Sequence, residues 1–198
     1  MIPAVRDRMQ PVSRNCLLHA FVAVLSLALG GAATAQSDPA LTIAESGDNY
    51  RLSVPVSRLV MTIPKGAFTV ANVSAGGATA SPRYFLLKDA VRGVSVSGWF
   101  ESSGGYAGFD SFWKNEANAL RRNGLSAANV ERTRVDKWEA VLYEQQIPKG
   151  TNANIRAEWI EEGTWIDVHI SVTTKDPSSV ARATALNVLK EITVAVLR

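Results

Sequence analysis

The chain has 198 residues, and its 21 Lys and Arg residues against 18 Asp and Glu residues give a formal net charge of +3 at pH 7. This length suits about one domain with a substantial hydrophobic core. Because Cys16 is the single cysteine of the sequence, an internal disulfide and a thiolate zinc site are both excluded.

Residues 1–35 have the order of a secretory signal peptide, which is basic, then apolar, then rich in small residues. Three arginines precede an apolar run from Leu17 to Leu29, and the small residues at 33–35 stand before Gln36. The run is shorter than the roughly 20 apolar residues of a membrane span. We therefore expect export to a periplasm or out of the cell, with a mature chain that begins near Gln36 and has no membrane span.

Loss of this signal changes the chemistry of the remaining chain. Cys16 lies before the apolar run, whereas a lipid-modified cysteine would follow it, so Cys16 is removed with the signal. Three arginines and one aspartate also leave, which lowers the net charge to about +1. A nearly neutral mature chain gives no argument for a nucleic-acid partner.

Residues 36–47 are polar without periodicity and are predicted to form an arm, followed by a single domain over 48–198. The first strands of that domain are predicted at 50–54, where apolar and polar residues alternate, and at 59–63, which is rich in β-branched residues. Residues 66–82 are rich in Gly, Ala and Ser. They predict a long mobile loop that contains at most a short strand.

Further elements follow in chain order. They are strands at 84–87 and 94–101, a helix at 109–122, a strand at about 137–146, a hairpin within 154–174 and a terminal helix after Asp176-Pro177. The first helix has Asp110 at its start and two arginines in its last turn, and Asn123-Gly124 ends it, in agreement with the helix dipole. Asp176 is expected to cap the terminal helix. Residues 192–196 fit either the end of that helix or a strand.

This succession predicts an α+β fold, an antiparallel β-sheet flanked by helices. A strand ending in Ile63-Pro64-Lys65-Gly66, a strand pair, the Phe112-Trp113 helix, the Trp138 strand, the Trp159/Trp165 hairpin and a C-terminal helix resemble the PsbP-like α/β/α sandwich superfamily. The resemblance covers about residues 50–198. That superfamily includes the extrinsic photosystem II protein PsbP, a transport factor that binds Ran and bacterial envelope proteins of unknown role. The resemblance implies a non-catalytic accessory or interaction domain, without catalytic residues or a cofactor.

The pair Glu162-Gly163 is read as a two-residue hairpin turn. In the resulting register one face of the hairpin is apolar, with Ile155, Ala157, Trp159, Ile166, Val168 and Ile170. The other face carries Arg156, Glu158, Ile160, Trp165, Asp167 and His169. A slip of one residue would mix the two sets, so the pattern supports the register.

The polar face of the hairpin places Glu158 directly opposite Asp167, and like charges in this position cost stability. One interpretation is a solvated outer face on which Arg156, diagonal to Asp167, neutralises the pair. The other is a shallow site for a cation, a cationic ligand or a basic partner. The candidate binding surface consists of Arg156, Glu158, Trp165, Asp167 and His169.

The tryptophans separate into two groups. Trp113, Trp138 and Trp159 fall on predicted core faces, whereas Trp99 has no clear assignment. Trp165 is predicted on the polar face, where it is either an exposed binding anchor or covered by the 66–82 loop or by Ile160.

Catalytic, cofactor-binding and metal-binding residues are not assigned. His169 is the only histidine after residue 35, and the segment from Gly93 to Gly98 reads G-x-S-x-S-G, which differs from the G-x-S-x-G of hydrolases. We expect an exported non-catalytic domain that binds a protein or another component of the cell envelope. The alternative is a small-ligand or cation-binding protein that uses the outer hairpin face, and the third hypothesis is a hydrolase that uses His169.

Overall fold

A computed structural model describes residues 39–71, 82–147 and 150–197, so the predicted signal peptide lies outside the described residues. The first half contains β1 (Thr42–Ser46), β2 (Asn49–Ser53), β3 (Leu59–Pro64), β4 (Thr69–Val70), β5 (Tyr84–Asp89), β6 (Val94–Ser102), a short 3-10 helix (Ser103–Gly105) and α1 (Phe109–Arg122). The second half contains β7 (Ala128–Val135), β8 (Trp138–Ile147), β9 (Gly150–Glu161), β10 (Thr164–Thr174), α2 (Ser178–Glu191) and β11 (Thr193–Val196).

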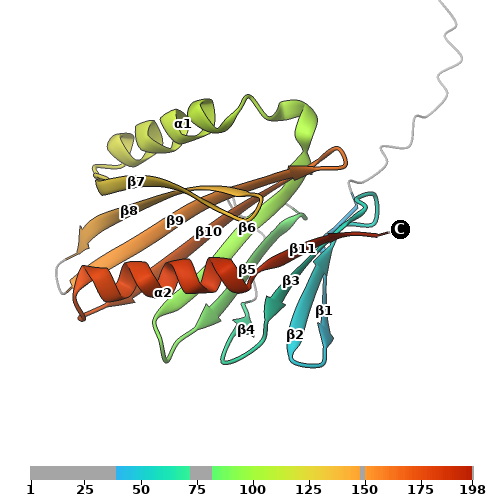
Figure 1. The fold of residues 1–198 in the computed structure, drawn as a ribbon, viewed down its shortest axis with the longest axis horizontal. Helices are drawn as coiled ribbons and strands as arrows, with labels where there is room; N and C mark the ends of the chain where they lie inside the picture. The colour runs from blue at the N-terminus through green and yellow to red at the C-terminus, as the bar shows by residue number, and fades with distance from the viewer. Residues whose placement is uncertain (1–38, 72–81, 148–149, 198) are drawn as a thin grey trace, which may run out of the picture. The chain divides into compact units, whose positions relative to one another are not determined.

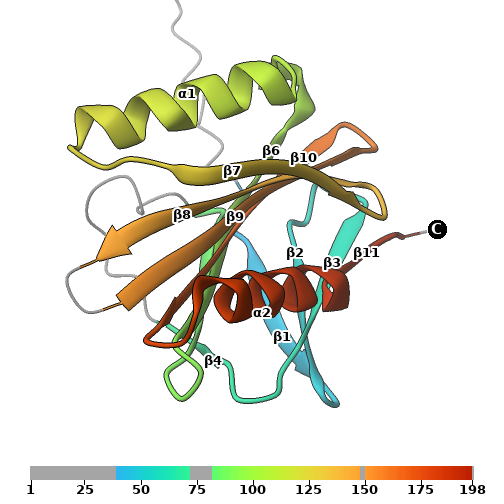
Figure 2. The ribbon, with the colours of Figure 1, turned by 60° about the vertical axis from the view of Figure 1, so that its left-hand side comes forward.

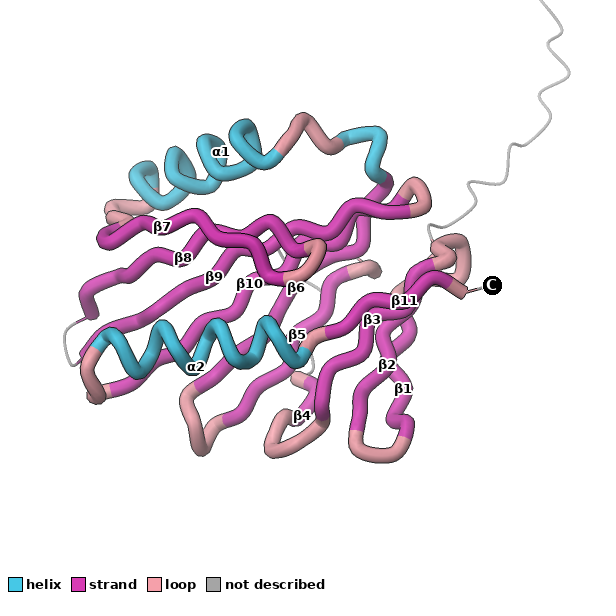
Figure 3. The backbone as a smooth tube through the Cα atoms, viewed as in Figure 1, coloured by secondary structure: helices cyan, strands magenta, loops and turns pink. Residues whose placement is uncertain are grey.

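The described strands form two antiparallel sheets, which confirms the predicted α+β class (Figure 1). The larger sheet has seven strands in the order β4-β5-β6-β10-β9-β8-β7, and the smaller sheet has four in the order β1-β2-β3-β11. Figure 3 shows that strands dominate the fold and that the helices lie outside the larger sheet.

The two helices lie on opposite sides of the larger sheet (Figure 2). Helix α2 and the smaller sheet pack on one side, here called the inner face, and α1 lies across the other, the outer face. Apolar residues of both sheets and of α2 form one continuous core on the inner face. The outer face is therefore the side on which polar side chains of the larger sheet are found.

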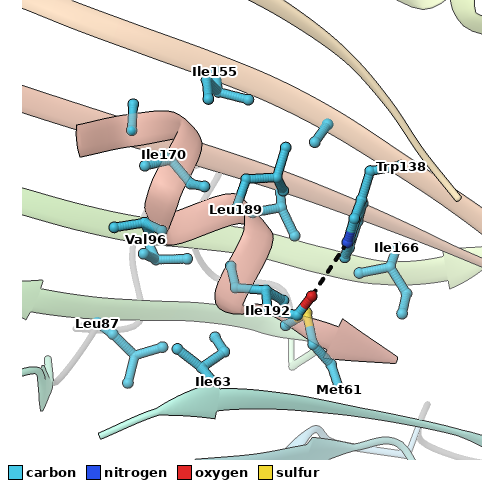
Figure 4. Packing of buried hydrophobic residues seen from close by; sticks show 14 of the residues in the cluster. Met61, Ile63, Leu87, Val96, Trp138, Ile155, Ile166, Ile170, Leu189 and Ile192 are labelled. Carbon is cyan, nitrogen blue, oxygen red and sulfur yellow. Dashed lines mark hydrogen bonds between the residues drawn. The ribbon is translucent and has the colours of Figure 1, made fainter. Parts of the chain in front are cut away.

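Trp138 belongs to the inner core and lies near Leu189 and Ile166 (Figure 4). Trp138 is fully buried, and its indole N–H donates to the carbonyl oxygen of Ile192 over 3.5 Å. Its ring packs edge-on against that of Trp159, with 5.1 Å between centroids. The prediction of both tryptophans in the core is confirmed, and a buried indole N–H with a partner costs little.

The β9–β10 hairpin forms with the register predicted from the sequence. Thr164 pairs with Glu161, and the ladder continues through Asp167 opposite Glu158 to Thr174 opposite Thr151. Both turn residues, Glu162 and Gly163, have positive φ angles, of 49° and 72°. This is the conformation that a type I′ turn requires, and it fixes which side chains share a face. All six residues of the predicted apolar face are buried.

Two edge strands were not predicted. Strand β1 lies within the segment predicted as an arm and pairs with β2, and strand β7 pairs with β8 across an irregularity between Ala128 and Glu131. Both are mostly exposed, so neither has the apolar alternation that reveals a half-buried strand. The bulge and the charged residues of β7 are typical of a protected sheet edge. Of the predicted 66–82 loop, β4 is the described strand, and 72–81 lies outside the described residues.

The helix ends agree with the sequence in one case and differ in the other. Gly124 has a φ of +70°, and the Leu125 N–H bonds to the Leu120 carbonyl over 2.9 Å, which closes α1 where Asn123-Gly124 predicted its end. The prediction that Asp176 caps α2 is wrong, because Pro177 is the N-cap residue and makes no side-chain cap bond. The carboxylate of Asp176 instead accepts a hydrogen bond from the Thr174 hydroxyl. Residues 193–196 form strand β11.

Candidate functional site

Helix α1 covers the polar face of the β9–β10 hairpin, so the prediction of a solvated face is wrong (Figure 2). Phe112 packs edge-on against Trp165 with 6.3 Å between ring centroids, and Trp113 packs against Tyr143 at 5.4 Å. Trp113 therefore belongs to this outer layer and not to the inner core, where it was predicted. The apolar stripe of α1 was visible in the sequence, but nothing in it indicates which face of the sheet the stripe covers.

Beneath α1 lies a buried layer of charged groups centred on Arg156. Its guanidinium donates to Asp167 Oδ2 over 2.7 Å, and its Nε lies 3.4 Å from Glu116 Oε2 of α1. The side chains of Arg156 and Asp167 are 8% and 9% exposed, and the guanidinium also lies 5.1 Å from the centroid of the Phe112 ring. The prediction that Arg156 neutralises Asp167 is confirmed, although the pair is buried and not solvated.

Glu158 has no exposed surface and lies directly opposite Asp167. Burial, with the negative charge of Asp167 as the next cause, raises the pKa of Glu158 to about 10. Burial also raises the pKa of Asp167 to about 6, although Arg156 lowers it. At neutral pH the pair therefore consists of a protonated Glu158 and an ionised Asp167.

The proton on Glu158 explains how Glu158 and Asp167 can lie directly opposite each other without repulsion between like charges. Glu158 Oε2 accepts a hydrogen bond from the indole N–H of Trp165. Glu158 Oε1 and Asp167 Oδ1 are buried, and no other group donates a hydrogen bond to either of them. A carboxylic acid O–H supplies the missing donor, and a hydrogen bond between the two side chains contributes to the raised pKa of Glu158. The like-charge penalty expected from the sequence is thereby removed.

His169 is half-buried beside this layer and holds a neutral ring. Its Nε2 lies 3.0 Å from Asn154 Oδ1, and among the described residues Asn154 is its one hydrogen-bond partner. Burial, followed by the positive charge of Arg156, lowers the pKa of His169 to about 3. A histidine with so low a pKa is a weak general base and would activate a nucleophile poorly at neutral pH.

We expect the imidazole signals of His169 to show no titration between pH 5 and pH 8 in NMR spectra of the histidine-labelled protein. The free energy of unfolding should then fall as the pH drops below about 6.5, because the unfolded chain takes up a proton that the folded chain refuses. A titration midpoint near 6.5 would show that the ring is solvated and would reopen a catalytic role.

A pocket of about 290 Å³ opens at the edge of the buried layer, over strands β6 and β10. Its lining residues are Trp99, Glu101, Ser102, Gly105, Trp165 and Asp167. In the strand register Trp99 lies opposite Asp167, and Glu101 lies opposite Trp165, so two indoles and two carboxyl groups alternate around a square on the outer face. The pocket thus joins two residues of the predicted candidate surface with four that were not predicted.

Both tryptophan walls of the pocket are braced by a second aromatic ring. Trp99 packs against Tyr84 with 4.8 Å between centroids, and Trp165 packs against Tyr106 at 5.2 Å. The indole N–H of Trp165 is further held by Glu158. Trp165 is therefore covered by Tyr106 and Phe112, and neither ring was among the covers considered from the sequence, which were Ile160 and the 66–82 loop. The pocket walls are fixed before any ligand arrives, which lowers the entropic cost of binding.

A second pocket, of about 230 Å³, lies near the hairpin turn and is lined in part by Val54, Ser57 and Thr164. The hydroxyl groups of Ser57 and Thr164 are hydrogen-bonded to each other over 2.9 Å, and Arg58 forms an ion pair with Glu162 beside them. These contacts link the two sheets, so the second pocket has a structural explanation. Within residues 39–71, 82–147 and 150–197, no group of three potential metal ligands occurs.

Comparison with known proteins finds distant similarity to solved structures. No protein-family model matches the chain, and no curated protein sequence matches it either. A crystal structure from Bacteroides thetaiotaomicron is 9% identical with a TM-score of 0.41, and the match covers 69% of this chain but 45% of that one. The protein of unknown function PA94 from Pseudomonas aeruginosa is 11% identical with a TM-score of 0.38, over 76% of this chain and 94% of that one. The chain therefore spans under half the length of the Bacteroides protein.

Proposed function

We propose that this protein is an exported, non-catalytic binding protein of the cell envelope that holds a small ligand in the pocket between Trp99 and Trp165. The observation that carries the proposal is the pocket itself, in which two braced indoles stand beside the buried carboxylate of Asp167. Concave sites with aromatic walls and a few fixed polar groups are the usual form of a small-molecule site.

The leading expectation from the sequence was a protein partner bound across the outer hairpin face. Arg156 and Glu158 lie beneath α1, so they offer a partner protein no open surface. The geometry instead favours the alternative, in which Trp165 and Asp167 contact a small molecule from one side. The part of the proposal that concerns export rests on the signal-like order of residues 1–35.

A non-catalytic role is supported by the state of His169. Its pKa near 3 and its bond to Asn154 leave the one histidine of the proposed mature chain poorly suited to general base catalysis. The order of strands and helices, with helices on both faces of the larger sheet, is also compatible with the resemblance to the PsbP-like superfamily. In the described part of the chain, neither helix has the length and apolar character needed to cross a membrane.

The pocket can be blocked by one substitution that has a matched control. A Cβ atom at Gly105 meets no atom within 4 Å, and one at Gly104, which does not line the pocket, meets only the Ser102 hydroxyl at 3.6 Å. We expect Gly105→Leu to fold and to lose the binding of small molecules, while Gly104→Leu binds as the wild type does.

The measurement is a thermal-shift screen of cationic, neutral and anionic small molecules, followed by calorimetric titration of each hit with all three proteins. The full chain is expressed and the protein is recovered as the host cell processes it. The proposal fails if no molecule of any charge class binds, or if Gly105→Leu binds as well as the wild type. It also fails if the protein turns over a substrate and His169→Ala does not.

A further inference from the structure

We propose that the ligand of this pocket is a small organic cation whose ammonium group lies between Trp99 and Trp165, against the carboxylates of Asp167 and Glu101. This inference rests on the proposed function and names the chemical class of the ligand. It follows from the arrangement of the four side chains, from the charge of the pocket and from the cation-binding properties of indole rings.

The strand register brings the four groups to one place. Trp99 opposite Asp167 and Glu101 opposite Trp165 are neighbouring pairs on the outer face of the β6–β10 ladder. Opposed side chains on antiparallel strands start about 5 Å apart, and residues two apart along a strand start about 7 Å apart. A square of these dimensions has room for one methylated or primary ammonium group between the two indole side chains and close to both acidic side chains.

The charged residues that line the pocket are acidic. Two of its six lining residues are acidic and none of those six is basic. Arg156 donates a hydrogen bond to Asp167 Oδ2. Oδ1 accepts at most one hydrogen bond, from the protonated Glu158, although a carboxylate oxygen has two lone pairs. Oδ1 is itself buried, so Asp167 attracts a cation in the pocket through the charge of its side chain, which is nine-tenths buried and therefore interacts more strongly than it would in water.

The aromatic walls select an organic cation over a metal ion. Indole is the aromatic side chain that attracts cations most strongly, and quaternary ammonium ligands are recognised in this way. A calcium ion would need 6 to 8 oxygen ligands, and magnesium needs octahedral geometry. The described residues contain no group of three potential metal ligands, and two indoles replace the oxygen atoms that a metal would require. The pocket volume of about 290 Å³ also limits the ligand to a small molecule.

The test compares choline with 3,3-dimethylbutan-1-ol, in which carbon replaces the charged nitrogen and the shape is unchanged. Both are titrated calorimetrically into the processed full-chain product. We expect choline to bind at least about tenfold more tightly than the neutral isostere, a ratio that corresponds to about 1.4 kcal/mol. The anionic analogue 3,3-dimethylbutyrate should bind more weakly than both.

Neutralising each of the two acidic residues in turn tests which carboxylate contributes to the preference for the cation. Asp167→Asn should remove the preference for choline, and because Asp167 is also an ion-pair partner, its fold is checked by circular dichroism. Glu101 is exposed, so Glu101→Gln keeps the fold and should weaken choline binding about threefold without changing the affinity of the neutral isostere. The control is Asp48→Asn, an exposed aspartate in the turn between β1 and β2, which should leave both affinities unchanged.

The outcomes separate this inference from the proposed function. Equal affinities for choline and its isostere, or an unchanged preference in Glu101→Gln and Asp167→Asn, would overturn the cation assignment. If neutral or anionic molecules bind and Gly105→Leu abolishes that binding, the binding function stands and only the ligand class is wrong. If no molecule of any charge class binds, the proposed function itself is wrong.

Discussion

Replacing Glu158 with glutamine is expected to raise the free energy of unfolding at pH 8 by up to about 5 kcal/mol. Glu158 is fully buried with a pKa of about 10, against 4.5 for an ordinary glutamate. Below pH 4.5 both the folded and the unfolded chain hold the proton. Between pH 4.5 and 10 the folded chain keeps it while the unfolded chain loses it, so the wild-type protein loses stability as the pH rises.

Glutamine has nearly the same shape as the protonated acid and makes the same bonds. Its amide oxygen accepts from the Trp165 indole, and its amide nitrogen donates to Asp167. Urea denaturation at pH 5, 6.5 and 8 measures the effect, and the advantage of Glu158→Gln should grow by up to ~1.4 kcal/mol per pH unit. Glu191→Gln, at an exposed position at the end of α2, is the control. A destabilised Glu158→Gln at pH 8 would show that the wild-type side chain is ionised.

The second large effect is expected at Arg156, where substitution by methionine should lower the free energy of unfolding by about 3 to 5 kcal/mol. Methionine fills much of the same volume, but it leaves the buried carboxylate of Asp167 without its partner and removes the ion pair with Glu116 of α1. The loss of a buried charge partner costs more than the pair contributes, because the remaining ion stays desolvated.

Neutralising Asp167 in the same protein should reverse most of that loss. The double variant Arg156→Met with Asp167→Asn carries no unpaired ion at this position, so its stability should approach that of the wild type. Arg134→Met is the control, since Arg134 forms an exposed ion pair with Glu139 and such pairs contribute about 1 kcal/mol or less. Equal destabilisation by Arg156→Met and Arg134→Met in urea titrations would contradict a buried role for Arg156.

Local features of this fold could be predicted because they depend on neighbouring residues. The two-residue turn at Glu162-Gly163 and the alternation of apolar residues predicted the hairpin register, and one interpretation of that register paired Arg156 with Asp167. The end of α1 at Asn123-Gly124 was predictable for the same reason. Each of these depends on contacts within one hairpin or one helical turn.

The environment of the same residues could not be predicted because it depends on distant packing. A polar hairpin face is normally read as solvated, yet α1, which lies far away in the sequence, covers it. The partner strand β6 was predicted, but its place beside β10 was not, so Trp99 and Glu101 were never connected with Asp167. A usable signal was present in 94–101, where Trp99 and Glu101 share the face of the serines and not that of the valines.

The most direct test of the site is a measurement of contacts between choline and the indole rings. Isotope-edited NMR of the tryptophan-labelled protein, with signals assigned through Trp99→Phe and Trp165→Phe, detects nuclear Overhauser effects from the choline methyl protons. We expect effects to the indole protons of both Trp99 and Trp165 and none to those of Trp138, which is buried in the inner core. Effects to neither pocket tryptophan, under conditions where calorimetry shows choline to be bound, would place the cation elsewhere and contradict the proposed site.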